Sequence, residues 1–276
     1  MMFRSCLEQF LYTPPAKVNI EKLSKKIKGK NVLITGASKG IGASIAYLFA
    51  KAGANLFLVA RNKERLVAIK KVLEKSDVNV QIFAVDLMDL EKVKQLVQEL
   101  NELSGGIDIF ISNAGKSIHR SFFNSLNRFH DFERTMNLNY FAPVLLMLSL
   151  YNKNSDKQGI IVNISTVAAL IFPTAKWAAY QSSKVAFDHW FRSVGAELRT
   201  KKISTISIYL PLVRTTMISP TKKYRNKAAL SSKQVAMIVA NKLISNKRHY
   251  KPWWAIFAQL GSVLFSGYLE RYSAKL

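Results

Sequence analysis

The chain is very poor in cysteine. Cys6 is the single cysteine among 276 residues, so a disulfide within the chain is excluded. The sequence also lacks an uninterrupted apolar run of about 18 residues, and we therefore expect no transmembrane helix. Its 4 histidines do not have the spacing of metal ligands, so we expect them to be structural or exposed and expect no metal site.

Acidic residues are scarce as well. Lys and Arg number 41 against 17 Asp and Glu, which gives a formal net charge of +24. The imbalance is largest from Lys201 to Leu276, where Glu270 is the one acid beside 14 basic residues. Such a surface attracts nucleic acid, anionic lipid or acidic substrates, or is simply solvated. No nucleic-acid-reading motif accompanies the charge, so we expect no specific nucleic-acid partner.

The first residues do not look like a secretory signal. Glu8 interrupts the apolar run, and no small-residue cleavage site follows it. A single cysteine is compatible with a reducing compartment. We therefore expect a cytoplasmic protein, and peripheral attachment to a membrane stays open as an alternative.

Hydrophobic residues make up 49% of the chain, enough for a sizeable core. Short apolar stretches alternate with helical ones. The pattern predicts strands over 31–34, 55–60, 80–85, 107–112, 159–164 and 204–210, and helices over 41–52, 61–75, 90–103, 129–152 and 177–199. This alternation predicts an α/β fold, a Rossmann-like doubly wound parallel sheet with helices on both faces. We expect one catalytic domain over 29–250, a helical and basic extension over 1–28, and an apolar, aromatic extension over 251–276.

A glycine-rich turn directly follows the first strand and reads Thr35-Gly36-Ala37-Ser38-Lys39-Gly40-Ile41-Gly42. The order strand, turn, helix is typical of a dinucleotide site. Gly36 allows a tight turn, while Gly40 and Gly42 allow a pyrophosphate and the helix to come close. The helix N-terminus adds unpaired N–H groups and partial positive charge. The alternative is an ordinary glycine-rich connection.

Arg61 stands where many dinucleotide folds place an acid, at the end of the second strand. An acid there would repel a 2′-phosphate, whereas a guanidinium would grip it with two hydrogen bonds. Lys39 in the glycine turn would add a second positive charge. The two residues predict NADP(H) rather than NAD(H), unless both side chains are merely exposed.

Tyr180 and Lys184 lie one helical turn apart, on one helix face. A free tyrosine has a pKa near 10, so about 0.1% of it is ionised at pH 7. We expect the ammonium of Lys184 to lower the pKa of the Tyr180 hydroxyl. Tyr180 would then give a proton to a carbonyl or take one from an alcohol.

Together these motifs resemble the short-chain dehydrogenase/reductase family. The matching pieces stand in family order over about residues 29–215: Thr35 to Gly42, Asp86-Leu87, Asn113-Ala114-Gly115, Asn139, Ile161 to Thr166, Tyr180 to Lys184, and Pro211 to Thr215. The resemblance implies a carbonyl/alcohol oxidoreductase that uses NADP(H), and a homodimer or homotetramer.

The resemblance also implies roles for single residues. Asp86 would bind the adenine ring, Asn139 would hold a proton-relay water, and Lys184 would bind the nicotinamide ribose. Thr215 would contact the carboxamide. The implied cofactor-binding set is Gly36, Ser38, Lys39, Gly40, Ile41, Gly42, Arg61, Asp86, Leu87, Asn113, Ala114, Gly115, Tyr180, Lys184, Pro211, Val213 and Thr215.

The sequence departs from the family pattern at two places. The family usually has two serines at the end of the fifth strand, where this chain has Ser165-Thr166. Position in the motif favours Thr166 as the residue that polarises the substrate oxygen, with Ser165 as the alternative. Leu212 follows Pro211 where a glycine is common. The implied catalytic set is Tyr180, Lys184, Asn139 and Thr166 or Ser165.

Two segments bear on the substrate. Thr216 to Lys227 forms a basic stretch, with Lys222, Lys223, Arg225 and Lys227, that would meet a phosphate or coenzyme A or be solvated. Residues 252–269 are apolar and aromatic with basic flanks, which suits a membrane interface or packing on the domain or a second subunit. Both membrane binding and packing on the protein would be consistent with a hydrophobic substrate of lipid, acyl or steroid type.

Three readings of the function follow. The first is an NADP(H)-dependent oxidoreductase with Tyr180 as proton donor and acceptor. The second is a soluble 3-oxoacyl-thioester reductase of fatty-acid synthesis. The third, of another class, is an NADP(H)-binding protein without turnover, against which Asn139, Tyr180 and Lys184 argue.

Overall fold

The computed structural model describes residues 2–103, 105–152, 158–218, 224 and 226–272. The basic residues Lys222, Lys223 and Arg225 lie outside these residues. Within the described part, no helix combines the length and hydropathy that crossing a bilayer requires.

A seven-stranded sheet forms the centre, in the order β3-β2-β1-β4-β5-β6-β9. All six pairings between neighbours are parallel, and β5 and β6 match over eight residues from Gly159↔Ile203 to Thr166↔Leu210. The strands are β1 (Asn31–Thr35), β2 (Asn55–Ala60), β3 (Val80–Ala84), β4 (Ile109–Ser112), β5 (Gly159–Thr166), β6 (Ile203–Leu210) and β9 (His249–Tyr250), with a separate pair β7 (Val213–Arg214) and β8 (Leu230–Ser231).

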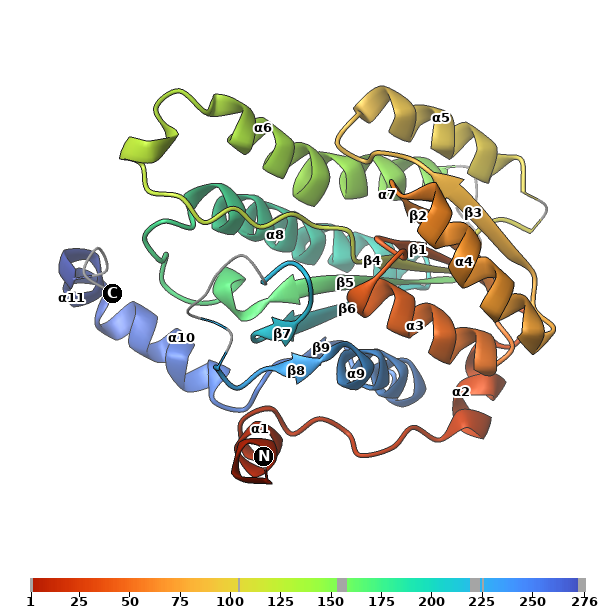
Figure 1. Ribbon diagram of the computed structural model, residues 1–276, viewed down its shortest axis with the longest axis horizontal. Coiled ribbons are helices and arrows are strands. Elements are labelled where there is room, and N and C mark those ends of the chain that lie inside the picture. Colours follow the sequence, from red (N-terminus) through yellow and green to blue (C-terminus); the bar gives the residue numbers. More distant parts are fainter. Residues whose placement is uncertain (1, 104, 153–157, 219–223, 225, 273–276) are drawn as a thin grey trace.

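Helices cover both faces of the sheet (Figure 1). One face carries α2 (Ile20–Ile27), α3 (Gly40–Lys51), α4 (Lys63–Leu73) and α9 (Ser232–Ser245). The other carries α5 (Leu90–Asn101), α6 (Phe129–Met136), α7 (Ala142–Asn152) and α8 (Ala178–Thr200). Short helical turns are η1 (Glu74–Ser76), η2 (Phe123–Ser125) and η4 (Val167–Ala169), and η3 (Asn137–Phe141) is a π-helix. The predicted doubly wound α/β fold is confirmed.

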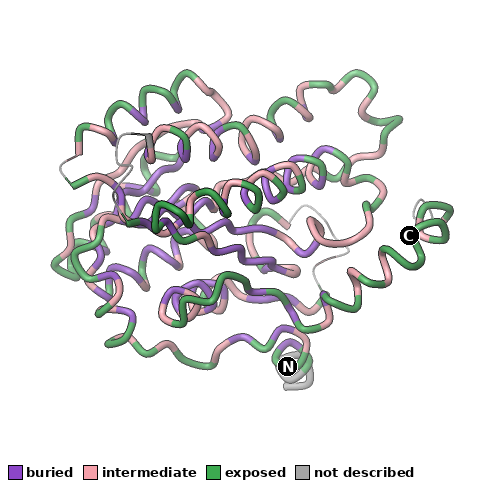
Figure 2. Tube along the Cα trace, turned by 180° about the vertical axis from the view of Figure 1, so that it is seen from behind, coloured by how far each residue is buried: buried purple, intermediate pink, exposed green. Residues whose placement is uncertain are grey.

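The core follows from the alternation of side chains along the strands. Val32 and Ile34 of β1 face the layer of α3 and α9, while Leu33 between them faces the layer of α5 and α7. Both faces are covered, so β1 and β2 at the centre of the sheet have unbroken apolar runs, Val32 to Ile34 and Leu56 to Ala60. Figure 2 shows the buried strands at the centre and the exposed faces of the helices around them.

The N-terminal residues are fastened to this domain. Leu23 and Ile27 of α2 are fully buried. In α1 (Met2–Tyr12), the carboxylate of Glu8 accepts hydrogen bonds of 2.6 and 2.8 Å from the guanidinium of Arg214 and one of 3.2 Å from the backbone N–H of Ala229. The helix is thereby tied to both ends of the segment that joins β7 to β8.

Several element boundaries differ from the sequence-based expectation. The helix predicted over 129–152 is divided into α6, η3 and α7. The sequence analysis did not predict α9 or β9, which add a helix and a seventh strand to the fold. The apolar tail forms two helices, α10 (Ala255–Leu264) and α11 (Ser266–Tyr272), which extend from the body of the molecule.

Candidate active site

A cavity of about 1030 Å³ lies where the six long parallel strands end. The residues that follow these strands all line it: Gly36 after β1, Arg61 after β2, Asp86 after β3, Asn113 after β4, Thr166 at the end of β5 and Pro211 after β6. Ligands bind at this edge of doubly wound sheets because the order of the strands reverses there, here between β1 and β4.

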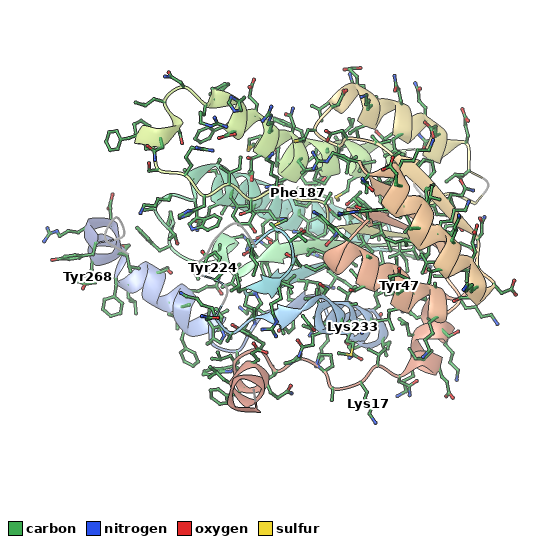
Figure 3. The ribbon with its side chains drawn as sticks, in the orientation of Figure 1. Lys17, Tyr47, Phe187, Tyr224, Lys233 and Tyr268 are labelled. Carbon is green, nitrogen blue, oxygen red and sulfur yellow. The ribbon has the colours of Figure 1, made fainter. Side chains whose placement is uncertain are left out.

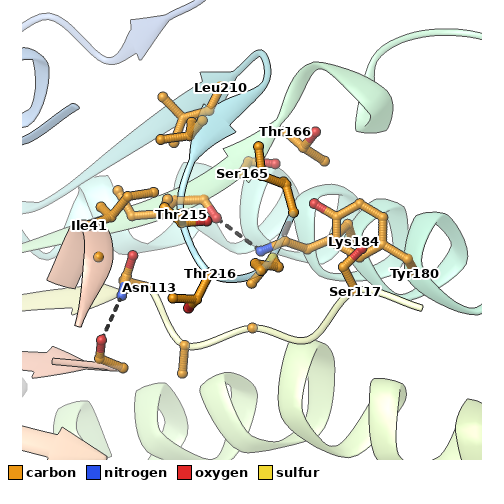
Figure 4. A pocket seen from close by; sticks show the side chains of 18 of the residues that line it. Ile41, Asn113, Ser117, Ser165, Thr166, Tyr180, Lys184, Leu210, Thr215 and Thr216 are labelled. Carbon is orange, nitrogen blue, oxygen red and sulfur yellow. Dashed lines mark hydrogen bonds between the residues drawn. The ribbon is translucent and has the colours of Figure 1, made fainter. Parts of the chain in front are cut away.

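The glycine turn forms one end of the cavity. Gly36 has φ +68°, and a Cβ atom there would lie 2.9 Å from Nδ2 of Asn113. A Cβ on Gly42 would collide with the carbonyl oxygen of Gly36. The side chain of Asn113 occupies the space beside these two glycines (Figure 4). Its Nδ2 donates to the backbone oxygens of Thr35 at 2.9 Å and Gly36 at 3.3 Å. Lys39 is the N-cap residue of α3, and its side chain makes no capping hydrogen bond. The N–H groups at the helix N-terminus therefore remain available to an anion.

Positive charge gathers beside this turn. Lys39, Arg61 and Arg65 all line the cavity. Nη1 of Arg61 lies 3.8 Å from Oδ2 of Asp86, and about two thirds of the Arg61 side chain is exposed. Asp86 also accepts a 3.0 Å hydrogen bond from the backbone N–H of Met88, which fixes its carboxylate at the end of β3. Because its side chain is largely exposed, Arg61 is accessible to an anionic group placed over β2.

Tyr180 faces the cavity from the first turn of α8, near the hydroxyl of Thr166 at the end of β5. Oγ1 of Thr166 accepts a 3.2 Å hydrogen bond from the backbone N–H of Ala168. Because an N–H cannot accept, the hydroxyl proton of Thr166 is not used in that bond. Ser165 is buried, and its hydroxyl donates to the carboxylate of Asp188 at 3.4 Å. The two neighbouring hydroxyls thus have different surroundings (Figure 4).

Lys184 is buried one turn further along α8, and its Nζ donates a 2.9 Å hydrogen bond to the carbonyl oxygen of Ile164 in β5. Burial lowers the pKa of the Lys184 amine to about 8. The carboxylate of Asp188, four residues later, opposes that fall. Asp188 is itself buried; it accepts a hydrogen bond from the hydroxyl of Tyr209 at 3.2 Å and forms an ion pair with Arg192 at 3.2 Å.

The pKa of the Tyr180 hydroxyl differs from the expectation. Burial raises the pKa of Tyr180 above the usual range for tyrosine, and the nearby hydroxyl of Thr166 offsets part of the rise. The prediction that the helical spacing to Lys184 makes the phenol acidic is therefore wrong for this structure. The reason is desolvation, since the amine of Lys184 donates to Ile164 instead of to the phenol.

Asn139 lies behind the cavity wall and is not among the residues that line it. Its side chain donates to the carbonyl of Lys116 and the hydroxyl of Ser183, both at 2.9 Å, and accepts from the N–H of Lys116 at 2.9 Å. The backbone widens to the π-helix η3 here. Pro143 explains this change, since it has no N–H for the carbonyl of Asn139 four residues earlier and its ring crowds that carbonyl.

Most of the predicted residues meet at this cavity. Of the predicted set, Gly42 and Asn139 are the two that do not line it, although Gly42 packs under the turn. The sequence analysis missed Gln181, whose side chain donates to the carbonyl of Ala168 at 2.7 Å and accepts from the N–H of Thr174 at 2.9 Å. It also missed the apolar lining residues Ile171, Trp177, Met217, Tyr224 and Trp254. No motif marks these residues; proximity in the fold brings them together.

Known proteins share this architecture. The chain is 43% identical over 225 residues to a fatty acyl-CoA reductase of Acinetobacter baylyi, covering 81% of this chain and 76% of that protein. It is 36% identical over 229 residues to the fatty acyl-CoA reductase Rv0547c of Mycobacterium tuberculosis, covering 83% of this chain and 76% of that protein.

Solved structures of other proteins are also similar to this chain. A short-chain dehydrogenase from Sphingobium yanoikuyae, in complex with NADPH, superposes with a TM-score of 0.75 at 25% identity, covering 90% of this chain and 96% of that one. A metagenomic short-chain oxidoreductase in complex with NADP gives a TM-score of 0.68 at 25% identity, covering 79% and 92%. The family model for short chain dehydrogenases matches residues 30–226, and the chain belongs to this family of oxidoreductases.

Proposed function

We propose that the protein is an NADPH-dependent reductase of long-chain fatty acyl thioesters, with Tyr180 as its proton donor. The observation that carries the proposal is the placement of Tyr180 and Thr166 near each other in the wall of a large, partly apolar cavity. The similarity to two fatty acyl-CoA reductases supports the choice of substrate.

The residues present fit a dinucleotide with a 2′-phosphate. The uncapped start of α3 offers backbone N–H groups to a pyrophosphate, and Gly36 and Gly42 let the turn pack closely against Asn113 beside it. Lys39, Arg61 and Arg65 supply positive charge where the 2′-phosphate of the adenosine ribose would lie. The NADP and NADPH complexes of the structural neighbours support the same assignment.

Bound NADPH would supply the hydride for the carbonyl carbon. Tyr180 would give its hydroxyl proton to the carbonyl oxygen, and its raised pKa keeps that proton in place at neutral pH. Thr166 has a hydroxyl hydrogen to donate to the same oxygen, whereas the hydrogen of Ser165 is engaged by Asp188. The ammonium of Lys184 would favour the phenolate that remains, because opposite charges close together stabilise each other.

For a thioester, this step leaves a hydroxyl group and the sulfur of coenzyme A on one carbon. The phenolate of Tyr180 would then take the hydroxyl proton back while the carbon–sulfur bond breaks. The sulfur leaves as a thiolate and takes a proton from the solvent, so the products are an aldehyde and the free thiol of coenzyme A. The same residues would reduce the ketone of a 3-oxoacyl thioester to an alcohol. The names of the two relatives favour reduction of the thioester itself.

The side of the cavity near Tyr180 suits an acyl chain. Trp177 packs edge-on against the ring of Tyr180, with 5.8 Å between ring centroids, and stacks on Tyr224 at 6.2 Å. Ile171 and Trp254 continue this apolar lining toward the C-terminal helices. Burying a methylene group against such a wall contributes about 0.8 kcal/mol. The length of the acyl chain should therefore affect binding strongly.

The homodimer or homotetramer that the family resemblance implies stays a prediction.

The first prediction concerns catalysis. Purified protein should oxidise NADPH in the presence of palmitoyl-CoA, measured by loss of absorbance of the reduced nicotinamide. Tyr180→Phe should lower kcat by about 10²- to 10⁴-fold because it removes the proton donor. Thr166→Val should cost about 10²-fold through loss of one donor to the oxygen. Ser165→Ala, the matched control, should change kcat by less than about tenfold. A Ser165→Ala loss that exceeds the Thr166→Val loss would reverse the assignment of the two hydroxyls.

The second prediction concerns the cofactor. Arg61→Asp should lower the ratio of kcat/KM for NADPH to that for NADH by at least about tenfold, because it replaces a cation near the 2′-phosphate with an anion. Lys63→Asp makes the same charge change at an exposed position that does not line the cavity, and should leave the ratio nearly unchanged. Equal ratios for the wild type and Arg61→Asp would refute the assignment.

The third prediction concerns pH. Because the pKa of Lys184 is lowered to about 8, its ammonium is present below that pH and is lost as the pH rises through it. The kcat/KM for NADPH, which reports the free enzyme, should therefore fall above pH 8. Asp188→Asn removes the charge that opposes the shift, so the fall should begin at lower pH. Glu197→Gln, an exposed change on the same helix, should not move it. An unmoved profile in Asp188→Asn would contradict the proposed role of the carboxylate.

A further inference from the structure

Two exposed apolar segments lie at the same end of the molecule. One is the 122–129 segment, which leads from β4 into α6. The other is the C-terminal segment, residues 253–268, which includes α10 and the start of α11. Both extend to the left in Figure 1 and to the right in the reverse view of Figure 2, where most of α11 is exposed. In Figure 3, Tyr268 lies at the outer end of the C-terminal segment.

The 122–129 segment is unusually apolar for an exposed loop. Phe122 and Phe123 are 73% and 79% exposed, and Leu126 and Phe129 are exposed to a similar extent. The residues just before it attach to the wall of the cavity. The backbone N–H of Arg120 donates to the carbonyl oxygen of Lys176 at 2.7 Å. This segment therefore lies beside the part of the chain that leads into Tyr180.

The C-terminal segment also contacts residues around the cavity. Trp254 lines the cavity, and the N–H of Phe172 donates to the hydroxyl of Ser262 in α10 at 2.9 Å. The outer surface of α10 carries Phe257, Val263 and Leu264, which are 65%, 75% and 74% exposed. Trp254, just before α10, thus reaches the cavity, while the outer side of the helix offers apolar side chains to the surroundings.

Helix α1 enlarges this surface. The ring of Phe10 packs edge-on against Trp253 with 5.5 Å between centroids, and the indole N–H of Trp253 donates to the carbonyl oxygen of Phe10 at 3.0 Å. Both rings remain substantially exposed. Helix α1 and the C-terminal segment, which are far apart in the sequence, therefore form one exposed surface.

Both segments have an excess of positive charge around them. From residue 116 to 134, four Lys and Arg stand against two acids, and Asp131 is already paired with Arg120 at 3.1 Å and Arg128 at 3.0 Å. From residue 247 to 272, four Lys and Arg stand against Glu270 alone. Aromatic side chains beside basic ones are typical of segments that bind the interface of an anionic bilayer.

We propose that the 122–129 segment and the C-terminal segment dock together on an anionic membrane surface, so that the cavity between them opens onto the lipid. The ten residues of α10 span about 15 Å, half of the hydrocarbon core of about 30 Å, which suits a helix lying in the interface. That a long acyl substrate enters from the lipid rests on the proposed function; the docking itself does not.

Charge favours this occupant over a second copy of the chain. A chain with net charge +24 and basic residues around both segments would place like charges against each other in a symmetric contact. An anionic lipid surface instead offers charge of the opposite sign together with an apolar layer. Each basic residue near such a surface contributes about 1 kcal/mol. Several of them, with the aromatic side chains, are sufficient for reversible attachment.

The test is co-sedimentation of the full chain with vesicles at about 0.1 M salt, where the Debye length is about 10 Å. Wild-type protein should bind vesicles of equal parts phosphatidylcholine and phosphatidylglycerol at least about tenfold more tightly than vesicles of phosphatidylcholine alone. Phe122→Ser with Phe123→Ser, and separately Phe257→Ser with Leu264→Ser, should each weaken that binding about tenfold or more. Val72→Ser with Leu148→Ser, exposed apolar residues outside both segments, should leave it unchanged.

NADPH binding by fluorescence confirms that each variant is folded, and it does not depend on the substrate assigned above. Absence of binding to anionic vesicles overturns the proposal. So does undiminished binding of either pair of variants, because both segments are required. Concentration-dependent dimerisation that the same substitutions abolish, without vesicle binding, would assign the surface to a second copy instead. A protein that docks as expected yet fails to reduce palmitoyl-CoA would reject the proposed substrate and leave the docking intact.

Discussion

The hydrogen bond from the buried amine of Lys184 to the carbonyl of Ile164 is the interaction on which the site depends. It fastens α8 to β5 at the point where both reach the cavity. Because Tyr180 is one turn before Lys184 and Thr166 is two residues after Ile164, the same bond brings the two hydroxyls together. A buried amine without an acceptor would carry a large desolvation cost, so the packing of helix and strand and the chemistry of the site are not separable.

The strand order supplies the second constraint. The order of the strands reverses between β1 and β4, and this reversal opens the crevice. Asn113 closes the floor of the crevice through its hydrogen bonds to the backbone of Thr35 and Gly36. One half of the cavity is thus a rigid backbone cradle, with cations at its outer end. The other half is built from side chains of α8 and from aromatic residues near the C-terminal helices. The arrangement separates an anion-binding end from an apolar end, as a phosphorylated cofactor and an acyl chain require.

Much of this arrangement could be predicted from the sequence, because the motifs follow strands whose carboxyl ends must meet. The glycine turn and Arg61 were located in that way, and the Tyr180–Lys184 pair was located by its spacing of one helical turn. The raised pKa of Tyr180 could not be foreseen, since it depends on burial that helical spacing does not reveal. The roles of Asp188 and Gln181 were also missed. Their hydrogen bonds join α8 to residues of β5, β6 and the loop after β5, and no local pattern encodes such contacts.

The most direct test is a measurement of the Lys184 pKa itself. Carbon-13 labelling of the lysine side chains, with Lys184→Arg used to assign the signal, allows the ε-carbon to be titrated by NMR. The account predicts a midpoint of about 8 for this one lysine. A midpoint near the ordinary value of 10.5 would show that the amine is solvated, and would contradict the buried contact that places Tyr180 beside Thr166.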